Sequence, residues 1–227
     1  MAAAALLLMP LAGLGWRLPA GALAGYGVIA TLTLTSLAGH APHCRFGPAN
    51  AVTLVRAAVM AVLLGILTEG AALAPLGRWC LAGGGAAALL LDGIDGWAAR
   101  RTGLASRFGA RFDMEVDALS VLLLSLLVWR AGQAGAWVLA VGLMRYMFVL
   151  AGWLWPELAA PLPPSIRRKA ICVVEIVLLL AALAPFLGPG AASCLCLAGL
   201  GLLSYSFAAD IVALVTVGQR RAPEVTT

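Results

Sequence analysis

Four of the five aspartates in this chain lie between positions 92 and 117, and their side chains are the clearest candidates for chemistry. Asp92 and Asp95 are three residues apart and Asp113 and Asp117 are four apart, so each pair shares one face of a helix. Carboxylates gathered beside membrane-spanning segments repel one another unless cations neutralise them. An all-oxygen ligand set favours Mg²⁺ or Mn²⁺ over zinc or copper. We therefore predict that these four aspartates hold divalent metal that acts on a phosphate-bearing substrate.

Small residues accompany the aspartates at helical spacing. Gly96 follows Asp95 directly, Ala99 comes one turn after it, and Gly109 lies one turn before Asp113. Small side chains let a ligand or a neighbouring helix approach the backbone closely. Helix packing explains each of them singly, but their alternation with aspartates favours a ligand cleft. The alternative without a ligand is a surface ion network between the aspartates and the nearby arginines, Arg100, Arg101, Arg107 and Arg111.

The composition places these residues in a membrane protein. Hydrophobic residues make up 63% of the 227-residue chain and charged residues only 11%, with a mean hydropathy of +1.00. These values predict an all-α, polytopic membrane helix bundle rather than a soluble domain with a large core. Apolar runs predict helical spans at 19–39, 50–68, 77–99, 112–130, 134–156, 168–187 and 190–217.

The predicted layout also gives an orientation. The short connection between the spans 77–99 and 112–130 makes these helices antiparallel neighbours, so that the two aspartate pairs face each other across a groove. Most basic residues fall on the same side as the aspartates, and the positive-inside rule makes that side cytoplasmic. The formal net charge of +5 reflects these loops and does not predict nucleic-acid binding. We expect the aspartates at the cytoplasmic face, where nucleotide substrates are found.

The acidic region resembles the signature of the CDP-alcohol phosphotransferase family. The run D-G-I-D-G-W-A-A-R begins at Asp92, and G-A-R-F-D-M-E-V-D begins at Gly109. They are similar to the family's D-x-x-D-G-x-x-A-R, a short spacer, and G-x-x-x-D-x-x-x-D. All defining positions are present: Asp92, Asp95, Gly96, Ala99, Arg100, Gly109, Asp113 and Asp117.

A second stretch resembles the N-x-x-T-x-x-R element that opens the family's first core helix. Here Asn50, Thr53 and Arg56 stand at those positions. An amide, a hydroxyl and a guanidinium near a helix N-terminus suit a diphosphate. The alternative for Asn50 alone is a helix N-cap.

The resemblance implies an enzyme that transfers a substituted phosphoryl group from a CDP-alcohol, commonly CDP-diacylglycerol, to an acceptor hydroxyl and releases CMP. It implies that the four aspartates hold two Mg²⁺ or Mn²⁺ ions and that Asp117 is also the general base. The pocket for the CDP-alcohol would be formed by Asn50, Thr53, Arg56, Gly96, Ala99, Arg100 and Gly109. Further expectations are a homodimer, placement in the cytoplasmic (inner) membrane with the active site facing the cytoplasm, and a six-helix membrane core. The core would occupy 40–218, after an apolar helical extension at 1–39 and before a polar tail at 219–227.

Basic residues in the later helices indicate where the acceptor binds. Arg145, Arg168 and Lys169, with Arg167 beside them, could gather at the mouth of the same cavity. Such a cluster fits an anionic acceptor such as glycerol 3-phosphate, inositol phosphate or phosphatidylglycerol. The alternatives are that 167–169 only set the topology and that the acceptor is neutral or zwitterionic, such as serine, inositol or choline. Glu175 and Tyr146 depart from the pattern of phosphatidylglycerophosphate synthases, in which glutamine and an acidic residue are expected.

Three other classes use acidic residues in membranes. Membrane prenyltransferases bind a diphosphate with aspartates and Mg²⁺, but normally carry two motifs in well-separated loops and more spans. A transporter or scaffold with a vestigial metal site would be expected to lack Asp117. A cation channel would not need the glycines and Arg100 at these intervals. The five cysteines show no zinc-ligand spacing.

Overall fold

The computed structural model describes residues 48–68, 78–79, 81–90, 107–155 and 165–221, together with the single positions 20, 23, 27 and 158. Within these residues every regular element is a helix, and no strand occurs among them. The predicted all-α class is therefore confirmed. The predicted N-terminal extension at 1–39, apart from three single positions, and the end of the predicted span 77–99 lie outside the described residues.

The named helices follow the predicted spans closely. They are α3 (Pro48–Thr68), α5 (Arg107–Arg130), the short 3₁₀ helix η3 (Ala136–Val138), α6 (Leu139–Leu154), α7 (Ile166–Ala182) and α8 (Pro189–Arg221). Two boundaries differ from the predictions by five residues, and the others by four or fewer. α5 begins at Arg107 rather than 112. Its first five residues include two arginines and therefore did not belong to the apolar run from which the span was predicted. α7 ends at Ala182 rather than 187, and Pro185 explains this since proline cannot donate to a helix and restricts the residue before it.

Within the part of the chain that the structure describes, two stretches are long and apolar enough to cross a membrane, Ala136–Leu154 and Pro189–Thr216. Only 22% of the most apolar 18-residue window of each is buried, and large apolar side chains such as Trp153 of α6 and Val212 of α8 are exposed. A core helix of a soluble protein would instead bury most of its apolar side chains. The outward apolar faces of α6 and α8 therefore match a lipid environment.

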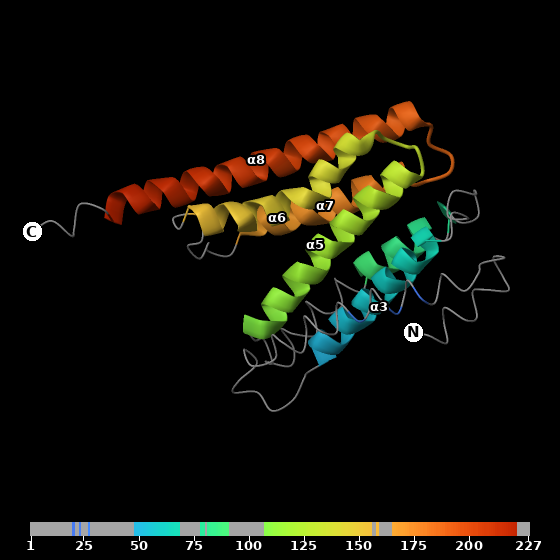
Figure 1. Cartoon of the computed structure of the whole chain (residues 1–227), viewed down its shortest axis with the longest axis horizontal. Coiled ribbons are helices and arrows are strands. Elements are labelled where there is room, and N and C mark those ends of the chain that lie inside the picture. Colours follow the sequence, from blue (N-terminus) through green and yellow to red (C-terminus); the bar gives the residue numbers. More distant parts are fainter. Residues whose placement is uncertain are drawn as a thin grey trace, which may run out of the picture.

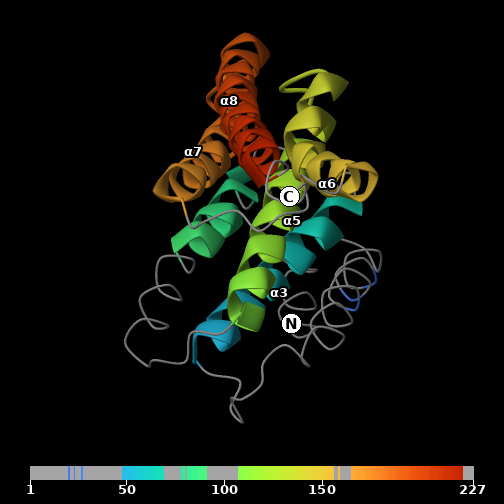
Figure 2. The same ribbon diagram turned by 90° about the vertical axis from the view of Figure 1, so that its left-hand side faces the viewer.

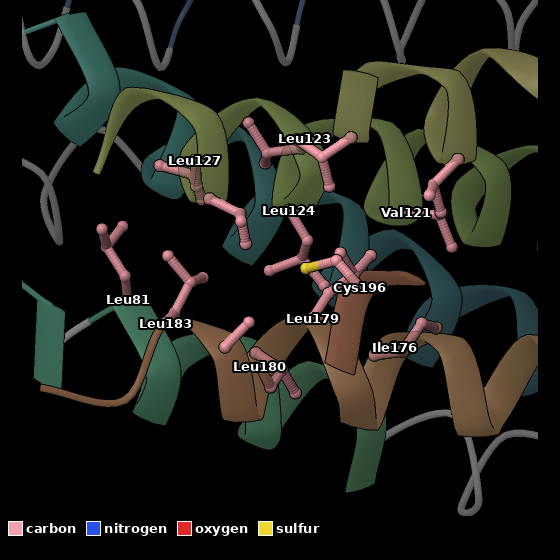
Figure 3. Packing of buried hydrophobic residues seen from close by; sticks show 14 of the residues in the cluster. Leu81, Val121, Leu123, Leu124, Leu127, Ile176, Leu179, Leu180, Leu183 and Cys196 are labelled. Atoms are coloured by element: carbon pink, nitrogen blue, oxygen red, sulfur yellow. The ribbon is translucent and has the colours of Figure 1, made fainter. Parts of the chain in front are cut away.

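The helices pack around α5 (Figure 1). α5 contacts α3, α6 and α7, and α7 packs along α8. Viewed end-on, α5 lies between α6 and α7, with α8 on the side away from α3 (Figure 2). Leucines of α5, including Leu124 and Leu127, meet Leu179 and Leu183 near the end of α7 (Figure 3). These four leucines are at most 1% exposed, so this contact forms the main apolar core.

Gly142 allows a close approach between α5 and α6. A Cβ atom at this position would lie 2.5 Å from the Cα of Leu122 and 2.8 Å from its Cδ1. Only a residue without a side chain fits such a gap. Arg145 lies three residues further along α6, so this approach sets its distance from α5.

We expect Gly142→Ala to lower the stability of the protein, because the added methyl group would meet the α5 backbone rather than a movable side chain. Overpacking of this kind costs about 1–3 kcal/mol. Gly201→Ala in α8 is the matched control, since no described atom lies within 4 Å of its Cβ position. Thermal unfolding in detergent should show a lower midpoint for Gly142→Ala and an equal or higher one for Gly201→Ala. Equal midpoints for Gly142→Ala and the wild type would contradict the close approach.

Candidate functional site

Arg56 joins α3 to the two aspartates of α5. Its Nη1 donates to Asp113 Oδ1 at 2.7 Å, and its Nη2 donates to Asp117 Oδ1. The Arg56 side chain is 3% exposed, whereas those of Asp113 and Asp117 are 31% and 23% exposed. A buried guanidinium therefore links two carboxylates that are themselves partly open to the surroundings.

A small apolar cluster beside these ion pairs holds α3 against α5. It consists of Ala57, Phe112 and Val116, all of them buried. Phe112 and Val116 are one turn apart and each directly precedes one of the aspartates. Because this apolar row faces α3, the adjacent row of Asp113 and Asp117 is carried to Arg56. The i, i+4 spacing read from the sequence is thus the spacing that lets one arginine reach both carboxylates.

Two further predicted residues lie near the ion pairs of Arg56, one on α3 and one on α5. Thr53 is buried in α3 one turn before Arg56, and Gly109 is partly buried in α5 one turn before Asp113. Asn50 lies in the first turn of α3. The other predicted members of the acidic site lie outside the described residues: Asp92, Asp95, Gly96, Ala99 and Arg100.

The two described aspartates of the acidic motif, Asp113 and Asp117, have side chains that suit a divalent cation. Among the residues that the structure describes, no group of three or more histidine, cysteine, aspartate or glutamate side chains forms a complete site. Asp113 and Asp117 supply only oxygen ligands, the type preferred by Mg²⁺ and Mn²⁺. Arg56 offsets one of their two negative charges, which leaves a net charge of −1 on the three side chains. The pair can thus supply oxygen ligands to a divalent cation, and the other two predicted ligands, Asp92 and Asp95, lie outside the described residues.

Two of the three predicted acceptor residues, Arg145 and Arg168, occupy ion-pair clusters, and the third, Lys169, is exposed next to Arg168. Arg145 Nη2 donates to Glu115 of α5 at 2.5 Å. Arg167 and Arg168, at the start of α7, both donate to Asp210 of α8, at 2.5 Å and 3.2 Å. We did not predict either carboxylate as part of a site.

The sequence contains a clear indication for Asp210, the first of the two carboxylates that were not predicted, and a weaker one for Glu115. Asp210 is the fifth aspartate of the chain and stands in an apolar run, where an ionisable residue is a functional candidate by default. Glu115 offered a weaker signal, because it lies on α5 between two predicted ligands but on a more exposed face.

The two clusters lie at the same end of the bundle as Asp113 and Asp117. Phe148 of α6 and Phe207 of α8 are in ring contact, with centroids 5.3 Å apart. Phe148 is three residues after Arg145, and Phe207 is three residues before Asp210. The start of α5, the end of α6 and the C-terminal half of α8 all lie toward the left of Figure 1. The two basic clusters and the aspartates of α5 therefore lie toward one end of the helix bundle.

Glu175 faces α8. Its side chain is 1% exposed, and neither carboxyl oxygen accepts a hydrogen bond from the residues that the structure describes. A Cβ atom on Gly199 would lie 2.5 Å from Oε2 and 2.6 Å from Oε1 of Glu175. Gly199 thus leaves space for the carboxyl group against the α8 backbone.

Comparison with known proteins gives one match. The family model described as CDP-alcohol phosphatidyltransferase matches residues 46–216, which is 171 of the 227 residues. No curated protein and no solved structure matches the chain. The matched range contains the acidic motif, the ion pairs of Arg56 and both clusters of basic residues.

Proposed function

Because the chain belongs to the CDP-alcohol phosphatidyltransferase family, we propose that it transfers a phosphatidyl group from CDP-diacylglycerol to an acceptor hydroxyl and releases CMP. The family is enzymatic, its members are integral membrane proteins, and they generally use divalent metal ions. The observation that carries the proposal is the convergence of Arg56, Asp113 and Asp117, which brings two separate sequence motifs together.

In this proposal Asp92, Asp95, Asp113 and Asp117 hold two Mg²⁺ or Mn²⁺ ions. Bound ions would neutralise the diphosphate of the donor and stabilise the departing CMP. Asp117 accepts the proton of the acceptor hydroxyl at a carboxylate oxygen. The hydroxyl oxygen then forms a bond to the phosphorus of the phosphatidyl group, and the bond from that phosphorus to CMP breaks.

Arg56 has a positioning role in addition to the proposed contact with the diphosphate. Its two hydrogen bonds fix the Oδ1 atoms of Asp113 and Asp117, so the second oxygen of each carboxylate is oriented as well. Its positive charge also lowers the repulsion between the two carboxylates. The remaining proposed contacts to the donor come from Asn50, Thr53, Gly96, Ala99, Arg100 and Gly109.

We propose an anionic acceptor, such as glycerol 3-phosphate, inositol phosphate or phosphatidylglycerol, bound by Arg145, Arg168 and Lys169. The charge balance at the start of α7 supports this choice, because Arg167 and Arg168 share the one carboxylate of Asp210 and the exposed Lys169 adds a third positive charge beside them. The protein would act at the cytoplasmic face of the inner membrane in phospholipid biosynthesis, as a homodimer with a six-helix core at 40–218.

The test is CMP release by the purified protein in detergent, with CDP-diacylglycerol and either Mg²⁺ or Mn²⁺. The acceptor panel contains glycerol 3-phosphate, inositol phosphate, phosphatidylglycerol, inositol and serine. Release that depends on both metal and acceptor would establish the reaction and identify the acceptor. Release with serine or inositol alone would replace the anionic acceptor by a neutral or zwitterionic one. A well-folded sample that neither binds cytidine nucleotide nor releases CMP would refute the transferase.

A further inference from the structure

Asp210 is a buried carboxylate in the apolar stretch of α8, and it binds two arginines with one oxygen atom. Arg167 Nη2 donates to Asp210 Oδ1 at 2.5 Å, and Arg168 Nη1 donates to the same atom at 3.2 Å. The Asp210 side chain is 8% exposed, whereas each arginine side chain is 30% exposed. The carboxylate therefore lies beneath the two guanidiniums, on their protein side.

The cluster carries an excess of positive charge. Arg167, Arg168 and Lys169 contribute three charges and Asp210 removes one, so the local net charge is +2 (3 − 1). Lys169 is exposed. The N-terminus of α7 adds the positive end of a helix dipole. Such a cluster attracts an anion, and the guanidiniums suit a phosphate oxygen in particular.

α8 contacts Arg167 through a second residue. The guanidinium carbon of Arg167 lies 5.8 Å from the centroid of the Tyr205 ring, within the range of a cation–π contact. Arg167 is thus held by both Tyr205 and Asp210, and Arg168 is tied to the same carboxylate. These contacts restrict two long side chains that would otherwise sample many rotamers.

We propose that Asp210 is a positioning residue that holds Arg167 and Arg168 together as a binding pair for the phosphate group of an anionic acceptor. The inference rests on the proposed function and deepens it, since it assigns the class of acceptor to a defined pair of side chains. Asp210 acts through the arginines and does not touch the acceptor.

Removal of the Asp210 charge has two opposing effects on anion binding. The net positive charge rises by one, which favours an anion, but the oxygen that holds the two guanidiniums then belongs to a neutral amide, which binds them more weakly, so they repel each other and separate. Because both arginines are partly exposed, water and salt screen the added charge. The loss of geometry is not screened, so we expect it to dominate.

The experiment measures CMP release by the full chain in detergent, with saturating CDP-diacylglycerol and Mg²⁺ and a varied acceptor concentration. Glycerol 3-phosphate, inositol phosphate and phosphatidylglycerol are the anionic probes, and inositol and serine are the neutral and zwitterionic ones. The variants are Asp210→Asn, the conservative Asp210→Glu, and Asp210→Asn in a background with Arg167→Gln and Arg168→Gln. Ser206→Ala is the matched control, because Ser206 is a buried, uncharged polar residue one turn earlier in α8.

We expect Asp210→Asn to raise the KM for the anionic acceptor about tenfold, the worth of one charge-assisted hydrogen bond. The kcat and the KM for CDP-diacylglycerol should change less than about threefold, because the aspartate site is untouched. Asp210→Glu should recover most of the acceptor affinity, and Ser206→Ala should match the wild type. In the background without the two arginines, Asp210→Asn should have no further effect on KM.

An unchanged or lowered KM in a well-folded Asp210→Asn protein would overturn the inference, since Asp210 would then be irrelevant to the anion or compete with it. An effect that persists without the two arginines would overturn it as well. If thermal unfolding shows that Asp210→Asn does not fold, the other variants test the inference. The variant without the two arginines must then raise the KM for the anionic acceptor, and Asp210→Glu must keep most of the acceptor affinity. A wild type active only with inositol or serine would overturn the inference while leaving the transferase intact. A wild type that releases no CMP with any acceptor would instead refute the proposed function.

Discussion

Replacement of Asp117 by asparagine is expected to reduce acceptor-dependent CMP release about a thousandfold, within the range for a positioned general base. Asparagine has nearly the same shape as aspartate but accepts no proton and is a poorer metal ligand. Its side-chain oxygen can still accept the hydrogen bond that Arg56 now donates to Asp117. The loss should therefore appear in kcat rather than in the stability of the helix bundle.

The matched control for this prediction is Ser125→Ala. Ser125 is buried in the same helix, two turns further on, and its hydroxyl donates only to the Val121 carbonyl at 2.8 Å among the described residues. We expect this variant to keep its activity within about threefold, since the bond lies within one helix. Measurements of kcat with the identified acceptor, alongside thermal unfolding, separate the two effects. Substantial activity in Asp117→Asn would exclude Asp117 as the base.

Replacement of Arg56 by methionine is expected to lower both activity and stability. The side chain is 3% exposed and bound to two carboxylates, so its loss leaves Asp113 and Asp117 close together without their shared cation. Breaking a buried ion pair by removing one partner costs about 3–5 kcal/mol, and the partial exposure of the aspartates should keep this case at or below about 3 kcal/mol. Arg145→Met is the control, because the Arg145–Glu115 pair is more exposed and should contribute less than about 1 kcal/mol to stability.

Arg56→Met also tests the metal site directly. If divalent ions bind at Asp113 and Asp117, they can replace part of the charge lost with Arg56. Added Mg²⁺ should therefore raise the unfolding temperature of Arg56→Met more than that of the wild type, and EDTA should remove the gain. A double variant, Asp113→Asn with Asp117→Asn, should show no response to Mg²⁺. A response of equal size in the double variant would place the ions elsewhere.

The sequence was a good guide to the fold wherever apolar periodicity was strong. The spans predicted at 50–68, 134–156 and 190–217 correspond to α3, to η3 with α6, and to α8. Boundaries differed where charge or proline altered the local pattern, at the start of α5 and the end of α7. Apolar runs report which residues can enter lipid, and helices continue beyond them as long as the backbone can hydrogen-bond.

The sequence by itself indicated the family, because the family's motif consists of residue types at fixed local spacing. Two aspartates four residues apart share a helix face in any fold that keeps the helix, and the family match over 46–216 agrees with this motif. The partners of the charged side chains were decided only by the tertiary structure. Arg56 is 57 and 61 residues from the aspartates it binds, and Asp210 is 42 and 43 residues from its arginines. Such contacts depend on how the apolar rows of different helices pack together, and one-dimensional spacing carries no direct record of that packing.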